Sequence, residues 1–206
     1  MRYGMVIDLR RCVGCNACTV ACKQSNGTPP GMFYSHVSLH EEGAYPNATA
    51  RYTPMLCGHC EEAACVSVCP TGASYRDEAG VVRVDHGKCI GCKYCIAACP
   101  YEVRSFLSER IEGYFPGSGL TEQERVMYGG FEVGKVYKCD FCRSKGYTDG
   151  IGPSCVRACP GDARVFGDLD DPESEVARLL AAEQVRVLGE EYGTKPNVYY
   201  VARSGA

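Results

Sequence analysis

The chain has 206 residues, of which 16 are cysteine and none is tryptophan, and its formal net charge is −3. Cysteine is several times more frequent than in an ordinary soluble domain, so cysteine chemistry is the first feature to explain. A slightly negative chain lacks the basic balance of a nucleic-acid-binding domain, which excludes a nucleic-acid partner, and its longest apolar stretches, such as 176–182, are too short to cross a bilayer.

The N-terminal residues lead directly into cysteine-rich sequence. Residues 5–7 are apolar and predict a short strand, and no apolar signal segment or cleavage site precedes them. The pair Arg10 and Arg11 is followed by cysteines rather than by the apolar stretch of a twin-arginine signal. We therefore expect a chain that has neither a signal segment nor a membrane anchor of its own.

The cysteines form four groups of four, and none is left over. Groups one and three share the spacing C-x2-C-x2-C-x3-C, group two has the spacing C-x2-C-x4-C-x3-C, and group four has a long middle loop. In chain order the groups are Cys12, Cys15, Cys18 and Cys22; Cys57, Cys60, Cys65 and Cys69; Cys89, Cys92, Cys95 and Cys99; and Cys139, Cys142, Cys155 and Cys159.

This spacing indicates [4Fe–4S] ligation. Three thiolates two residues apart can reach three irons of one cubane from a single tight loop, and Gly14 and Gly91 permit a close approach of the backbone. The fourth cysteine follows about one helical turn later, and in two-cluster ferredoxins that residue ligates the other cluster. Disulfides and zinc are the alternatives, but disulfide scaffolds belong to small secreted chains, and zinc ribbons use two separated pairs of cysteines.

The helical turns between the third and fourth cysteines should end near Pro70, Pro100 and Pro160. Proline disfavours the helical conformation of the residue before it, so the turn ends there. In group one, Lys23 takes the place of the proline, and the helix is free to continue.

The remaining elements are predicted from local patterns. Residues 81–84 and 136–137 predict short strands before groups three and four, and residues 199–201 predict a packing strand near the end. Segments 24–54 and 101–135 are rich in Gly, Pro, Tyr and charge without sustained periodicity, which predicts loop insertions. A helix is predicted to begin at Asp171-Pro172 and to end near Gly189.

An internal duplication organises these elements. Residues 8–22 align with residues 85–99 at a constant offset, and groups two and four match more loosely. The sequence therefore predicts an α+β fold of two fused ferredoxin-like units that bind four [4Fe–4S] clusters, with loop insertions and a C-terminal helix and tail. The expected divisions are 1–80 with the insertion 24–54, 81–168 with the insertion 101–135, and 169–206 for the helix and tail.

Motifs spread over nearly the whole chain carry a resemblance to a known family. They are M-V-I-D-x3-C at 5–12, L-C-x-H-C-E-x3-C at 56–65, C-P-T-G-A at 69–73, C-I-G-C-x2-C at 89–95, C-P-Y at 99–101, K-C-D-x-C at 138–142 and G-T-K-P-N-V-Y-Y at 193–200. In these motifs the chain resembles the iron–sulfur electron-transfer (beta) subunits of the dimethyl sulfoxide reductase, or molybdopterin oxidoreductase, family. It looks like the subset that serves polysulfide, tetrathionate, arsenate, sulfoxide or catechol reductases.

The resemblance implies a crossed ligand scheme. Groups one and four exchange their fourth cysteines, and groups two and three do likewise. The implied ligand sets are Cys12, Cys15, Cys18 and Cys159 (set one); Cys139, Cys142, Cys155 and Cys22 (set two); Cys57, Cys60, Cys65 and Cys99 (set three); and Cys89, Cys92, Cys95 and Cys69 (set four). Some relatives replace the second cysteine of group three and hold a three-iron cluster, whereas this chain keeps Cys92.

The resemblance also implies a function. Such a subunit has no active site of its own and relays single electrons, in anaerobic respiration, between a large molybdopterin catalytic subunit and an integral membrane, quinone-reactive subunit or a soluble donor. It would lie at the cytoplasmic membrane as a peripheral part of a complex, on the extracytoplasmic side, with the cytoplasm as the alternative. The alternative function is a four-cluster subunit of a cytoplasmic formate dehydrogenase or hydrogenase complex.

Two further features of the sequence give expectations. His59 lies between two cysteines of group two, and we expect it to hydrogen-bond near a cluster rather than to ligate iron, while His86 is expected in a solvated loop. Glu61 and Glu62 lie inside the loop of group two, whereas basic residues flank group one. Negative charge opposes the addition of an electron, so the cluster of group two is expected to have the lower reduction potential of the two.

Overall fold

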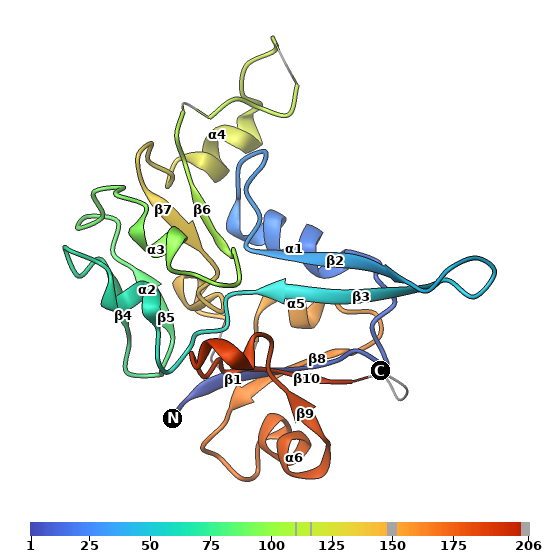
Figure 1. Ribbon diagram of the computed structural model, residues 1–206. Coiled ribbons are helices and arrows are strands. Elements are labelled where there is room, and N and C mark those ends of the chain that lie inside the picture. The colour runs from blue at the N-terminus through green and yellow to red at the C-terminus, as the bar shows by residue number, and fades with distance from the viewer. Residues whose placement is uncertain (110, 116, 148–151, 203–206) are drawn as a thin grey trace.

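The computed structural model describes residues 1–109, 111–115, 117–147 and 152–202, which form two lobes side by side (Figure 1). One lobe is built on a four-stranded sheet. Its strands in spatial order are β8 (Arg164–Asp168), β1 (Tyr3–Asp8), β10 (Val198–Val201) and β9 (Val185–Arg186). The central strand β1 pairs with β8 antiparallel and with β10 in parallel.

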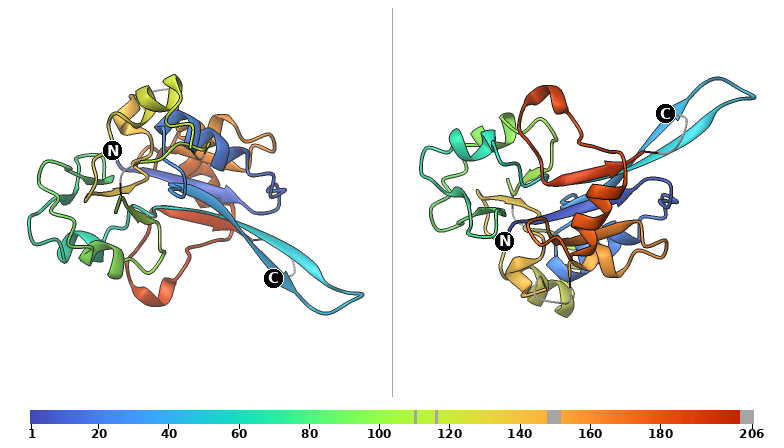
Figure 2. Two further views of the ribbon diagram at one scale, coloured as in Figure 1. Left: turned by 90° about the horizontal axis from the view of Figure 1, so that it is seen from above. Right: turned by 90° about the horizontal axis from the view of Figure 1, so that it is seen from below.

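The other lobe holds two small two-stranded sheets, and a long hairpin extends from the body of the molecule (Figures 1 and 2). The small sheets are β4 (Ser74–Arg76) with β5 (Val82–Val84), and β6 (Arg104–Phe106) with β7 (Val136–Lys138). The hairpin is β2 (Ser35–Glu42) with β3 (Thr49–Leu56). Tyr45 at its tip is 95% exposed, so this arm reaches well away from the core.

A simple rule relates the strands to the cysteine groups. The strand that precedes each group pairs with a strand that follows another group: β3 with β2, β5 with β4, β7 with β6, and β1 with β8. The first and last groups are therefore brought together by the pair β1–β8. The middle two groups are joined by the pair β4–β5.

The predicted turns of helix are present and end as expected. They are α2 (Ala64–Ser67), α3 (Tyr94–Ala97) and α5 (Ser154–Arg157), each of which ends just before a Cys-Pro pair. The helix of group one, α1 (Ala17–Asn26), continues past Cys22, as the absence of proline after that cysteine predicts. Gly27, with φ 61°, ends α1 in the left-handed conformation.

The core uses both faces of β1. Met5 and Ile7 belong to the main buried cluster, which also contains cysteines of α1 and α5. Val6 points to the other face and packs with Val176 and Val201 beneath α6 (Glu175–Ala182). The strand is therefore apolar on both sides, because the cysteine sites cover one face and a helix covers the other.

The two predicted insertions contain more regular structure than expected. Segment 24–54 forms most of the β2–β3 hairpin, and segment 101–135 includes β6 and the helix α4 (Glu122–Tyr128). Thr121 and Glu124 form a capping box at the start of α4, in which each side chain bonds the other residue's backbone N–H. The sequence contains this T-x-x-E capping signal. Because one segment contains strands and the other contains a strand and a helix, the expectation of loops alone is wrong for both.

The C-terminal helix is shorter than predicted. Ser174, rather than Asp171, caps α6, and its Oγ accepts a hydrogen bond from the Ala177 N–H at 3.1 Å. The Asp171 carboxylate instead accepts from the Glu173 N–H at 2.9 Å, which makes a turn before the helix. The helix ends at Ala182, well before Gly189, because the chain must extend to pair β9 with β10.

The strand pairings also bear on the expected divisions of the chain. The pair β4–β5 spans the boundary expected between residues 80 and 81, and β1–β8 joins the first division to the end of the second. The lobes are thus built from strand pairs that join distant parts of the chain, and the division into two units remains a prediction.

Two short 3-10 turns, Arg143–Lys145 and Glu190–Tyr192, complete the described elements. Within the described ranges, no helix combines the length and apolar character needed to cross a membrane.

A buried hydrogen bond fixes the hairpin to the central sheet. The Tyr200 hydroxyl in β10 donates to the Pro54 carbonyl oxygen at 2.8 Å. We expect Tyr200→Phe to lower the free energy of unfolding by about 1–3 kcal/mol, because it leaves a buried carbonyl without its donor. Anaerobic denaturant titration of the holo-protein measures this, with Tyr199→Phe on the opposite face of β10 as control. Equal stability of the two variants would contradict the assignment.

Candidate iron–sulfur cluster sites

Each cysteine group begins with a loop that turns through a left-handed residue. The third residue of each C-x2-C pair has positive φ: 71° at Gly14, 45° at His59, 70° at Gly91 and 54° at Phe141. At Gly91 a Cβ atom would lie 2.2 Å from the Gly134 carbonyl oxygen, so glycine is required there. The predicted role of both glycines in close backbone approach is consistent with these angles.

His59 and Phe141 occupy the equivalent loop positions of groups two and four, and they stack on each other. Their ring centroids are 3.9 Å apart, and both side chains are fully buried. The His59 Nδ1 accepts a hydrogen bond from the Val82 N–H at 3.1 Å, which leaves the proton on Nε2. The stack therefore links the loop of group two to the loop of group four.

Three cavities are each lined by four cysteine side chains drawn from two groups. One is lined by Cys12, Cys15, Cys18 and Cys159; a second by Cys22, Cys139, Cys142 and Cys155; and a third by Cys57, Cys60, Cys65 and Cys99. These combinations are the same as sets one, two and three. In every case the fourth cysteine comes from a different group than the other three.

The remaining cysteines lie around a smaller apolar cluster. Cys89 and Cys95 are buried there against Ala73 and Val136, and Cys69 packs at its edge. The Cys69 Sγ accepts a hydrogen bond from the Ser74 N–H at 3.4 Å. Cys92, which lies between Cys89 and Cys95 in the chain, is exposed. These are the members of set four.

Interactions between the thiols support the same grouping. Burial and the thiols of Cys57, Cys65 and Cys99 raise the pKa of Cys60 to about 11, although a hydrogen bond with Thr194 lowers it. Such mutual effects require the side chains to be close, so the fourth cysteine of group three lies beside the first three of group two.

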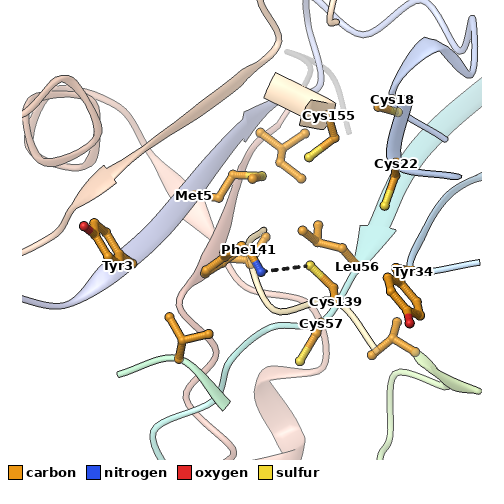
Figure 3. Close-up of a cluster of buried hydrophobic side chains, with 14 of the residues drawn as sticks. Tyr3, Met5, Cys18, Cys22, Tyr34, Leu56, Cys57, Cys139, Phe141 and Cys155 are labelled. Carbon is orange, nitrogen blue, oxygen red and sulfur yellow. Dashed lines mark hydrogen bonds between the residues drawn. The ribbon is translucent and has the colours of Figure 1, made fainter. Parts of the chain in front are cut away.

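The second set shows the same behaviour. Burial raises the pKa of the Cys22 thiol, and the thiols of Cys155 and Cys142 raise it further. The helix α1 thus carries Cys22 away from its own loop and toward group four. Figure 3 shows Cys22 and Cys155 facing the same part of the core.

The sets follow one another in a row. The thiol of Cys139, in set two, interacts with that of Cys57, in set three, and the two are neighbours in Figure 3. Cys155 of set two interacts with Cys18 of set one. Cys65 of set three packs against the cluster that holds Cys89 and Cys95 of set four. The spatial order is therefore one, two, three, four.

The donor chemistry fits iron–sulfur clusters. Among the described residues, no three Cys, His, Asp or Glu side chains converge as the ligands of a single metal ion do. The thiols instead surround cavities, as ligands at the corners of a cluster must. His59 adds a second observation, because its buried Nε2 has no hydrogen-bond partner among the described residues. An iron–sulfur cluster beside this loop would offer sulfur atoms that accept a hydrogen bond from the His59 Nε2–H.

Comparison with known proteins agrees with this geometry. Residues 11–73, 48–111 and 88–164 each match a family described as a 4Fe-4S dicluster domain. The chain is 45% identical to the B subunit of the selenate reductase of Mesobacillus selenatarsenatis, over 98% of this chain and 72% of the relative. It is 39% identical to the iron–sulfur subunit of the arsenate respiratory reductase of Shewanella sp., over 100% of this chain and 98% of the relative.

A third relative is the iron–sulfur B subunit of a putative dimethyl sulfoxide reductase of Halobacterium salinarum. It is 42% identical, and the alignment covers 97% of this chain and 78% of the relative. The chain belongs to this family of reductase iron–sulfur subunits. The resemblance inferred from the motifs is thereby confirmed, while the ligand of each cluster remains a prediction.

Several charged residues beside groups one and two of this iron–sulfur subunit form ion pairs. Glu61 forms an ion pair with Arg2, and Glu62 with Lys195 at 3.5 Å. Beside group one, the Arg10 guanidinium is 2.7 Å from the Asp8 carboxylate. These ion pairs offset part of the surface charge on both sides, and the expected difference in reduction potential remains a prediction.

One histidine lies differently from expectation. His86 is half-buried, with Nε2 3.2 Å from the Val136 carbonyl oxygen and its ring packed on Tyr137, so it is not a solvated loop residue. His59 is buried and accepts a hydrogen bond from the Val82 N–H, and its expected hydrogen bond near a cluster remains a prediction.

Sequence reasoning missed three buried cations close to the thiols, namely Arg104, Lys138 and Arg164. A shared position links two of them, because Arg104 and Arg164 lie at the same distance along the chain after Cys99 and Cys159. A search for charged residues at a fixed distance after the fourth cysteine of each group would have found this pair.

The crossed scheme can be tested with four variants. We expect Cys22→Ser and Cys142→Ser to alter one and the same paramagnetic signal of the reduced protein, because both cysteines line one cavity. Cys15→Ser and Cys159→Ser are expected to alter a different signal, because they line another. Low-temperature paramagnetic resonance makes the comparison. If Cys22→Ser affects the same signal as Cys15→Ser, each group binds its own cluster and the crossed scheme is wrong.

Proposed function

We propose that this chain is the electron-transfer subunit of a respiratory reductase and that it holds four [4Fe–4S] clusters in one row. The observation that carries the proposal is the succession of four cysteine sets, each drawn from two groups and each adjacent to the next. When bound, each cluster supplies one-electron exchange at its iron atoms.

The chain's own residues bind and insulate these groups. The thiols of sets two and three lie largely in the interior, where Leu56, Phe141 and Tyr34 pack beside them and exclude water. Backbone N–H groups bond to the sulfur atoms, as the Phe141 N–H does to the Cys139 Sγ at 3.4 Å (Figure 3). Such donors stabilise thiolate charge in the interior.

The ends of the row are the parts of the path that partners can reach. Cys15 of set one and Cys92 of set four are exposed, and the apolar residues before them, Val13 and Ile90, are 65% and 66% exposed. We place a large molybdopterin catalytic subunit at one end and a quinone-linked membrane subunit or soluble donor at the other. The substrate chemistry then belongs to the catalytic partner, and this chain is not itself an enzyme.

The proposed location follows from the proposed partners. A quinone-linked membrane subunit would hold this chain at the surface of the cytoplasmic membrane as a peripheral part of the complex. We propose the extracytoplasmic side, with the cytoplasmic side as the alternative outcome of a fractionation experiment on the intact complex.

The number of clusters is directly measurable. We expect anaerobically purified protein to contain about 16 iron and about 16 acid-labile sulfide per chain, with little zinc, and to take up about four electrons in a reductive titration. The reason is that four complete sets each bind one four-iron cluster. About half this iron, or one zinc per set, would contradict the proposal.

A further inference from the structure

Three cationic side chains are buried along the row of cysteine sets. Arg164, Lys138 and Arg104 are 3%, 6% and 6% exposed, whereas most other charged side chains of the described residues lie at the surface. Burial of a charge is costly unless an opposite charge compensates it. Their positions therefore need an explanation, and each one lies next to thiols of two different sets.

Arg164 lies between sets one and two. Its Nη2 is 3.4 Å from the Cys18 Sγ, and the guanidinium also interacts with the Cys155 thiol. The Ser35 Oγ accepts a hydrogen bond from the same Nη2 at 3.1 Å and holds the group in place. Cys18 belongs to set one and Cys155 to set two.

Arg104 has the equivalent position between sets three and four. Its Nη2 is 2.9 Å from the Cys65 Sγ, a thiol of set three, and it interacts electrostatically with Cys95 of set four. The Ser74 Oγ accepts a hydrogen bond from its Nη1 at 2.9 Å. A serine therefore holds each arginine.

Lys138 lies in the remaining gap. It is opposite Arg104 in the β6–β7 pair, and its Nζ donates to the carbonyl oxygens of Val82 and Cys139. It interacts electrostatically with Cys139 of set two and with Cys65 of set three. Each pair of neighbouring sets thus has one buried cation that interacts with thiols of both sets.

We propose that these cations are positioning residues that separate neighbouring clusters electrostatically and raise the reduction potential of the two clusters on either side. The proposal rests on the four-cluster function proposed above. A cluster with four thiolate ligands is negative and becomes more negative when it accepts an electron. Two such neighbours repel each other in the interior, where charges are poorly screened. A fixed cation in the gap offsets this repulsion, so adjacent clusters can be reduced together.

The test is a redox titration of the holo-protein monitored by paramagnetic resonance. Arg164→Met, Lys138→Met and Arg104→Met each remove one cation. Each is expected to lower two of the four potentials, so that at a fixed potential the ratio of reduced to oxidised cluster falls at least tenfold, or about 59 mV for a one-electron couple. Arg164→Lys keeps the charge and should shift the potentials less, and the exposed Arg125→Met should shift none.

The pattern of overlap makes the test specific. Arg164→Met and Lys138→Met should share one shifted cluster, Lys138→Met and Arg104→Met should share another, and Arg164→Met and Arg104→Met should share none. A general loss of structure would not produce this pattern. Shifts of all four potentials in every variant, or of none, would overturn the proposal.

Iron content separates this proposal from the function on which it rests. Wild-type protein with fewer than four clusters would contradict the proposed function, whereas four clusters with unmoved potentials in the variants would contradict only the role of the cations. If a methionine variant fails to assemble its clusters, Ser35→Ala and Ser74→Ala are milder changes. Each removes only the hydrogen bond between a serine and a guanidinium group. They are expected to lower the same pairs of potentials, and unchanged potentials would overturn the proposal.

Discussion

One helical turn separates the third and fourth cysteine of each group, and the rest of the structure depends on this constraint. The turn points the fourth thiol away from its own loop, and three cavities take their fourth cysteine from another group. Each group must therefore pack against another, and the strand pairs β1–β8 and β4–β5 bring the required groups together. Cys22 illustrates the consequence, because α1 places it beside Cys155 and Cys142.

This constraint also gathers the negative charge of many thiolates in the interior, where it must be compensated. Sixteen thiols gathered in one small chain would carry a large negative charge when they bind metal. The interior supplies backbone N–H donors and three buried cations, and two of these cations, Arg104 and Arg164, lie at the same distance after the fourth cysteine of their groups. The same side chains that make burial of the thiolates possible therefore lie where they can influence electron transfer.

The sequence predicts the parts of the structure that depend on local rules. The strands before groups one, three and four and the ends of the short helices at Cys-Pro follow from pattern and proline chemistry. The β2–β3 hairpin was not predicted, because its strands lack a clear apolar alternation and their pairing is fixed by the groups on either side. The buried cations were not predicted either, because a lone basic residue in a short strand normally faces water.

We propose that four clusters form a single row, each held by cysteines from two groups. Anomalous scattering at the iron absorption edge, from crystals of the anaerobically prepared holo-protein, would locate the iron of each cluster. We expect four iron sites in the order of sets one to four, with Cys22 beside the site of Cys139 and Cys159 beside the site of Cys12. Fewer than four sites, a branched arrangement, or Cys22 on the same cluster as Cys12 would contradict it.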